Sequence, residues 1–319
     1  MGEENNNINF SIALDGFREE QDAKAVGWAV AEVIKKLSQV IDITSLFDVT
    51  ISYDYQKALN SIDRGVDTSQ DLTPSKGDVI GVAMTVGVKR NGKHGAHIVF
   101  HAPYLEGILD PEDAENWPIA LGIIAHECAH VSNLSAFNKC FPGMLLTYRC
   151  KDIHEQLRSN CWLAVFEEYA ATRLSVAFDE AQISRLKDSF VKQAAKLYDN
   201  AKDETFHYQA HRNVDITLNK VYSEITSTLT LAAYFLGACA GAGIDYKENN
   251  AEAFSSFKWL TPFIDRLDLV CNSIFERYGR WETIGEMEVI SDILDSIAAH
   301  LGVTLKETPR GIYVGINSF

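Results

Sequence analysis

A long apolar run surrounds two histidines in the middle part of the sequence. Residues 118–137 read PIALGIIAHECAHVSNLSAF, and no turn signal interrupts their apolar side chains. Such a run predicts a largely buried α-helix, with Pro118 near the first turn, where its missing N–H does no harm. His126 and His130 are four residues apart in this run. Their side chains are therefore expected one above the other on a single helix face.

The segment His126-Glu127-Cys128-Ala129-His130 has the H-E-x-x-H spacing of a zinc-binding helix. Two imidazoles one helical turn apart can reach the same Zn²⁺ ion. Glu127 projects about 100° round the helix axis from His126, so it can contact a water on the metal without being a ligand. We therefore expect Zn²⁺ as the cofactor, His126 and His130 as metal ligands, and Glu127 as the general base. Two core histidines without a metal are the alternative interpretation.

A catalytic zinc needs a third protein ligand and an open fourth position. Residues 161–175 read CWLAVFEEYAATRLS, which predicts a second helix carrying Glu167 and Glu168. The face that contains Glu168 otherwise holds small residues, which would let this helix pack tightly against the histidine helix. We therefore favour Glu168 as the third ligand, with Glu167 as the alternative.

An H-E-x-x-H helix followed by a glutamate on the next helix resembles the pattern of gluzincin-type metallopeptidases. The run Glu168-Tyr-Ala-Ala-Thr-Arg-Leu-Ser is similar to a segment of the ImmA/IrrE group within them, and the resemblance covers about residues 20–180. It implies a cytoplasmic zinc peptidase with a compact α+β zincin core. In that core His126, His130 and Glu168 would be ligands and Glu127 the base.

The rest of the chain predicts an α+β fold. Apolar periodicity indicates a helix at 19–41, strands at 47–54, 78–86 and 96–102, a turn at Asn91-Gly92, a helix at 152–178 and a hairpin at 303–316. We expect a zincin-like core with a small, mainly antiparallel sheet and an active-site helix, followed by a mostly helical C-terminal part. Residues 1–190 are predicted as the metallopeptidase domain and 191–319 as a helical accessory region, with a single domain as the alternative.

Two further groups of histidines are candidates for the site. The strand AHIVFH, upstream of the histidine helix, is interpreted either as an edge strand that takes a peptide by strand addition, with His97 or His101 near the cleft, or as a plain core strand. His207, Tyr208 and His211 could supply a donor to the transition state, although solvated helix residues are the simpler interpretation.

Composition limits the partners. The formal net charge of −15 and the absence of a basic cluster argue against a nucleic-acid partner. The N-terminus lacks the features of a secretory signal, so a cytoplasmic location is expected, and the six dispersed cysteines are expected as free thiols. Residues 225–244 carry no charge but are rich in small side chains, which favours a buried helix over a membrane span.

These patterns together predict a zinc-dependent metallopeptidase that hydrolyses a peptide or protein substrate. The alternative is a catalytically inactive metal-binding sensor or interaction module with a zincin fold. Two histidines and a carboxylate also form the ligand set of some iron oxygenases, but histidines four residues apart on one helix argue against that class.

Overall fold

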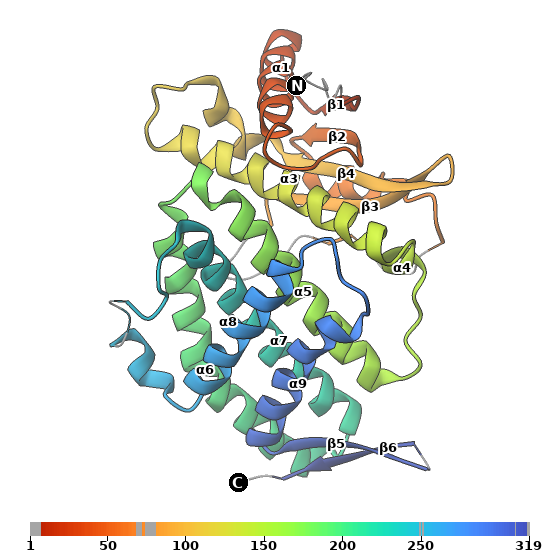
Figure 1. Cartoon of the computed structure of the whole chain (residues 1–319), viewed down its shortest axis with the longest axis vertical. Coiled ribbons are helices and arrows are strands. Elements are labelled where there is room, and N and C mark those ends of the chain that lie inside the picture. The colour runs from red at the N-terminus through yellow and green to blue at the C-terminus, as the bar shows by residue number, and fades with distance from the viewer. Residues whose placement is uncertain are drawn as a thin grey trace. The chain divides into compact units, whose positions relative to one another are not determined.

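The chain forms two compact units in the computed structural model, which describes residues 8–67, 72–73, 81–248, 250, 252–309 and 311–317. The first unit is Met1–Tyr148 with Leu174–Glu180, and the second is Arg149–Arg173 with Ala181–Phe319. Figure 1 colours the chain from the N-terminus to the C-terminus and labels most of its helices and strands. This division differs from the expected boundary near residue 190, which falls inside helix α6 (Gln182–His211).

The first unit combines a small sheet with helices. Its strands are β1 (Ser11–Asp15), β2 (Leu46–Ser52), β3 (Ala83–Arg90) and β4 (Lys93–His101). Its helices are α1 (Glu20–Leu37), α2 (Tyr55–Asn60), α3 (Asn116–Cys140) and α4 (Met144–Thr147), with short 3₁₀ turns at Ala102–Tyr104, Glu106–Leu109 and Val176–Phe178. The predicted helix at 19–41 and the strands at 47–54 and 96–102 are confirmed, whereas part of the predicted strand 78–86 lies outside the described residues.

The sheet is mixed, with strand order β1-β2-β4-β3. β1 pairs with β2 and β2 with β4 in parallel, and only β3 and β4 are antiparallel. The expectation of a mainly antiparallel sheet is therefore wrong. One reason is β1, which the sequence patterns did not identify: helix α1 connects it to β2, and a helical crossover joins parallel strands. The other is that the predicted strands β2 and β4 pair in parallel.

A tight turn joins β3 to β4 at Asn91-Gly92, as predicted. Both residues have positive φ angles, 49° at Asn91 and 80° at Gly92. This is the conformation of a type I′ turn, whose twist matches that of the two antiparallel strands. The turn fixes the register of β3 against β4, in which Thr85 faces Ile98 and Gly87 faces Ala96.

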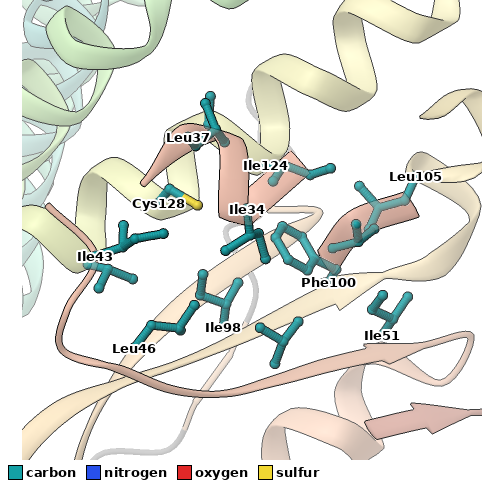
Figure 2. Close-up of a cluster of buried hydrophobic side chains, with 14 of the residues drawn as sticks. Ile34, Leu37, Ile43, Leu46, Ile51, Ile98, Phe100, Leu105, Ile124 and Cys128 are labelled. Carbon is teal, nitrogen blue, oxygen red and sulfur yellow. The ribbon is translucent and has the colours of Figure 1, made fainter. Parts of the chain in front are cut away.

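The main core of the first unit lies between the sheet and helices α1 and α3. Figure 2 shows its side chains, which include Ile34 of α1, Ile98 and Phe100 of β4, and Ile124 of α3. All four are fully buried. Side chains at alternate positions of β4 point into this core, so the next residues along the strand face the opposite side of the sheet.

The short return segment Leu174–Glu180 completes this unit. Phe178 packs against the main core cluster. A Cβ atom at Gly122 of α3 would lie only 2.7 Å from the Cβ atom of Asp179. The glycine therefore lets the return segment approach α3 closely.

The second unit is helical, as expected for the C-terminal part. Its helices are α5 (Ile153–Ser175, apart from its last two residues), α6 (Gln182–His211), α7 (Val214–Ala242), α8 (Thr261–Glu276) and α9 (Gly285–His300). A 3₁₀ turn lies at Ala253–Phe257, and the predicted hairpin is formed by β5 (Val303–Thr308) and β6 (Gly311–Ile316). Phe166 of α5 contacts Trp281 edge to face, with 5.5 Å between ring centroids. Tyr169 of α5 also contacts Phe275 of α8, with 6.3 Å between ring centroids, so α5 packs against the later helices.

Helix α7 is the most apolar helix of the second unit. Among the described residues it alone is long and apolar enough to cross a bilayer, and 56% of its most apolar window is buried within the protein. It packs closely on α5, because a Cβ atom at Gly237 would lie 2.4 Å from the main-chain oxygen of Tyr169. Length and composition alone are weak evidence for a membrane span, since core helices of soluble proteins share them.

A polar network joins three helices of this unit around Asp295 of α9. Tyr222 of α7 donates a hydrogen bond of 2.9 Å to Asp295, His154 Nε2 lies 3.3 Å from it, and Arg158 of α5 pairs with it. Burial alone would raise the pKa of Asp295, but hydrogen bonds from His154 and Tyr222 and the charge of Arg158 outweigh burial and hold that pKa below its usual range. The carboxylate is therefore stabilised in its ionised form.

Candidate metal centre

Helix α3 carries both predicted histidine ligands in its interior. His126 and His130 are half-buried, and their Nε2 atoms lie 3.1 Å apart. The two rings are nearly perpendicular, with 4.7 Å between centroids. The expectation that the two side chains meet on one helix face is confirmed.

The separation of the two imidazole nitrogens fits a shared metal ion. Zn–N bonds are about 2.0–2.1 Å long, so two nitrogens on a tetrahedral zinc lie about 3.3 Å apart. The observed distance of 3.1 Å is close to this value. Two imidazoles held in this way can therefore act as a pair of nitrogen ligands with little rearrangement.

Glu168 of α5 joins the two histidines as the third member of the group. One candidate ligand atom from each of His126, His130 and Glu168 lies within 4.8 Å of the other two. All three side chains are half-buried. Within the described residues, the group includes Glu168 and not Glu167. Two imidazole nitrogens with one carboxylate oxygen can hold a metal ion, and the ligand set is one that zinc accepts.

Glu127, the predicted general base, lies against strand β3. Its side chain is 6% exposed, and the hydroxyl of Thr85 lies 2.7 Å from its Oε2 atom. The same hydroxyl is 3.0 Å from the main-chain oxygen of Glu127. Thr85 was not predictable as part of the site, because a lone threonine in a strand has no spacing that links it to a residue on a later helix.

Tyr55 of α2 is a second group that the sequence did not indicate. Its hydroxyl is buried and has no hydrogen-bond partner among the described residues. Burial raises the pKa of the Tyr55 phenol, and the negative charge of Glu127 raises it further. The ring stacks on His101, with 5.6 Å between centroids. Tyr55 therefore stays protonated and neutral near neutral pH.

The interpretation of β4 as an edge strand is wrong. β4 pairs with β2 on one side and with β3 on the other. Its residues Ile98 and Phe100 face the core beneath α3, so alternation places His97 and His101 on the opposite face of the sheet. His97 is buried there and lies 2.8 Å from the hydroxyl of Thr50. Burial lowers the pKa of His97, which keeps it neutral as a part of the core.

The second group of histidines lies on α6. His207 and His211 are exposed at the end of this helix, and Tyr208 is half-buried between them. His211 Nε2 lies 3.4 Å from Glu204, a buried carboxylate that also pairs with Lys220 at 2.8 Å. This environment fits the simpler interpretation of helix residues with local partners, and a role as transition-state donors stays a prediction.

The cysteines are free thiols, as expected. Four of the six are buried and two are half-buried. Cys128, inside the H-E-x-x-H segment, is fully buried, and burial followed by the charge of Glu127 raises the pKa of its thiol. Its side chain points into the main core cluster, so it is a packing residue (Figure 2).

Comparison with family models, with curated proteins and with solved structures finds no match for the chain. The geometry of the His126, His130 and Glu168 group is compatible with an H-E-x-x-H zinc site, and the group could hold a metal ion.

Proposed function

We propose that the protein is a zinc-dependent metallopeptidase that hydrolyses a peptide or protein substrate, within a gluzincin-like fold. The observation that carries this proposal is the convergence of the His126, His130 and Glu168 ligand atoms within 4.8 Å. Two neutral nitrogens and one carboxylate leave a fourth tetrahedral position for water or substrate, as in catalytic zinc sites. The net charge favours a substrate that is not a nucleic acid, and we expect the reaction in the cytoplasm.

The proposed chemistry divides between the metal and Glu127. A bound Zn²⁺ would polarise the scissile carbonyl and lower the pKa of an adjacent water to near 7. Glu127 would accept a proton from that water and pass it to the leaving amine, which needs one carboxylate oxygen within hydrogen-bond reach of both. The carboxylate of Glu127 suits this role because it is buried and hydrogen-bonded to Thr85, which restricts its orientation. The imidazoles of His126 and His130 would act in their neutral forms.

The first experiment measures metal content by elemental analysis of protein purified without added metal. We expect about one zinc per chain, bound by two histidines and one glutamate. Variants His126→Ala and His130→Ala should lose it. Glu168→Ala should lose most of the zinc, whereas Glu167→Ala, its neighbour on α5, should retain it and serves as the matched control.

The outcomes separate the possible roles. Zinc together with cleavage of a peptide library, read by mass spectrometry and absent in Glu127→Gln, would support the peptidase. Zinc without any cleavage would favour the inactive metal-binding module. Iron in place of zinc would favour oxygenase chemistry, and no bound metal after zinc is supplied would overturn the proposal.

A further inference from the structure

The hydroxyl of Thr85 is placed to act on Glu127 because of the face of β3 on which it lies. Thr85 pairs with Ile98 of β4, and residues paired across antiparallel strands share a face of the sheet. Ile98 points into the core beneath α3, whereas Val86, the next residue of β3, packs in a separate cluster with Tyr55 and Val99. Thr85 is therefore directed to the side of the sheet that carries α3.

Gly87 also lies on the side of the sheet that carries α3. It is the next residue of β3 on the same face as Thr85, and an added Cβ would lie 3.2 Å from a methyl group of Leu134 in α3 and 3.3 Å from one of Leu146 in α4. The two leucine side chains therefore pack closely over Gly87, which agrees with the direct contact of the Thr85 hydroxyl with Glu127 of α3.

A threonine hydroxyl carries one proton, and Glu127 offers it two acceptors. The carboxylate Oε2 at 2.7 Å is the nearer one, and the main-chain oxygen at 3.0 Å is the other. Hydrogen bonds to a charged acceptor are shorter and stronger than those between neutral groups, so the proton is directed to Oε2 while Glu127 is ionised. A β-branched threonine in a strand has restricted rotamers, which adds to the rigidity of the contact.

We propose that Thr85 is a positioning residue for Glu127: its hydroxyl holds Oε2 in place and leaves Oε1 as the oxygen that exchanges a proton during hydrolysis. This inference rests on the proposed function, since it assigns a role within the same reaction. The contact between the Thr85 hydroxyl and the Glu127 carboxylate exists without a substrate and can be examined by itself.

The test compares Thr85→Val, which keeps the branched shape and removes the donor, with Thr85→Ser, which keeps the donor. In Thr85→Val, we expect kcat to fall about tenfold, because one hydrogen bond to a charged group is lost. KM and the zinc content should stay unchanged. Thr85→Ser should restore most of kcat. Thr50→Val is the matched control, because it removes a buried hydroxyl from the same sheet that bonds His97 on the opposite face.

Crystal structures of the two Thr85 variants give a readout that does not depend on activity. We expect the Glu127 carboxylate to leave its present orientation in Thr85→Val and to keep it in Thr85→Ser. An unmoved carboxylate in Thr85→Val, or equal losses of kcat in the two Thr85 variants, would overturn the positioning role. Failure of the proposed function would look different, because the wild-type protein would then bind no zinc or cleave no peptide. The carboxylate orientation in Thr85→Val would still decide whether Thr85 holds Glu127.

Discussion

The Nε2 atoms of His126 and His130 lie 3.1 Å apart on successive turns of α3, close to the separation that a shared zinc ion requires. The helix supplies this geometry without help from loops, because residues four apart project from the same face. Around both histidines α3 is largely buried, and this packing holds the backbone that carries the two imidazoles. Metal binding should therefore raise the stability of the folded protein and leave its fold unchanged.

Removal of the metal should lower the melting temperature of the protein. A ligand present at about 100 times its dissociation constant stabilises the folded state by about 2.7 kcal/mol, and zinc sites often exceed this ratio. Differential scanning calorimetry with and without EDTA checks this, with His126→Ala as the control that should not respond to the chelator. Equal shifts in the two proteins would show that EDTA acts elsewhere.

Substitution of Glu127 by Gln should abolish hydrolysis and leave the metal bound. General bases contribute about 10²–10⁴ to the rate, and glutamine has the size of glutamate without its capacity to accept the proton. Peptide cleavage and zinc content are measured on the same preparation. Glu115→Gln, an exposed change before the start of α3, is the control, and a similar loss in both variants would contradict the assigned role.

The helical unit should lose stability in acid through Asp295. The pKa of Asp295 in the folded protein is lower than that of an ordinary aspartate, so the ionised carboxylate stabilises the unit above the ordinary aspartate pKa of about 4. This contribution is lost as the pH falls through the folded-state pKa. The free energy of unfolding, measured with urea between pH 7 and pH 3, should therefore decrease less in Asp295→Asn than in the wild type.

Asp292→Asn provides the comparison for this experiment. Asp292 also pairs with Arg158, at 2.8 Å, but its side chain is 53% exposed, against 28% for Asp295. Exposed ion pairs contribute little because water screens them. The Asp292 variant should therefore follow the wild-type pH dependence, and an equal effect of the two substitutions would refute the special role of the buried network.

Replacement of Gly237 by alanine should destabilise the second unit. The added Cβ would lie 2.4 Å from the main-chain oxygen of Tyr169, so helices α5 and α7 must move apart. Overpacking of this kind costs about 1–3 kcal/mol in the free energy of unfolding, measured by urea denaturation. Gly285→Ala is the control, because its new Cβ would lie 3.6 Å from the Thr283 hydroxyl, an ordinary van der Waals distance. No difference between the two variants would contradict the tight approach.

The local parts of the structure were predictable from the sequence, and the histidine helix was the clearest case. Periodicity identified α1 and α3, and the Asn91-Gly92 pair identified the turn between β3 and β4. Each of these signals lies within a few neighbouring residues. The pairing of His126 with His130 followed for the same reason, since helical geometry alone brings them together.

The order of the strands was not predictable in the same way. β1 is a short strand of five residues, and its parallel pairing with β2 depends on residues more than thirty positions away. The same limit hid Thr85, whose hydroxyl meets a carboxylate 42 positions further along the chain. Strand order and buried hydrogen bonds arise from long-range packing, for which a single sequence has no local pattern.

The return segment Leu174–Glu180 has a consequence for biosynthesis. The first unit includes this segment, with Phe178 packed against its core, although the chain has already passed through the whole of α5. A nascent chain that has emerged only to Tyr148 therefore lacks part of the unit and exposes the apolar surface that Phe178 covers. Domains generally fold as units during synthesis, so the first unit can close only after residue 180 has left the ribosome. A protein truncated after Tyr148 should accordingly need chaperones or aggregate.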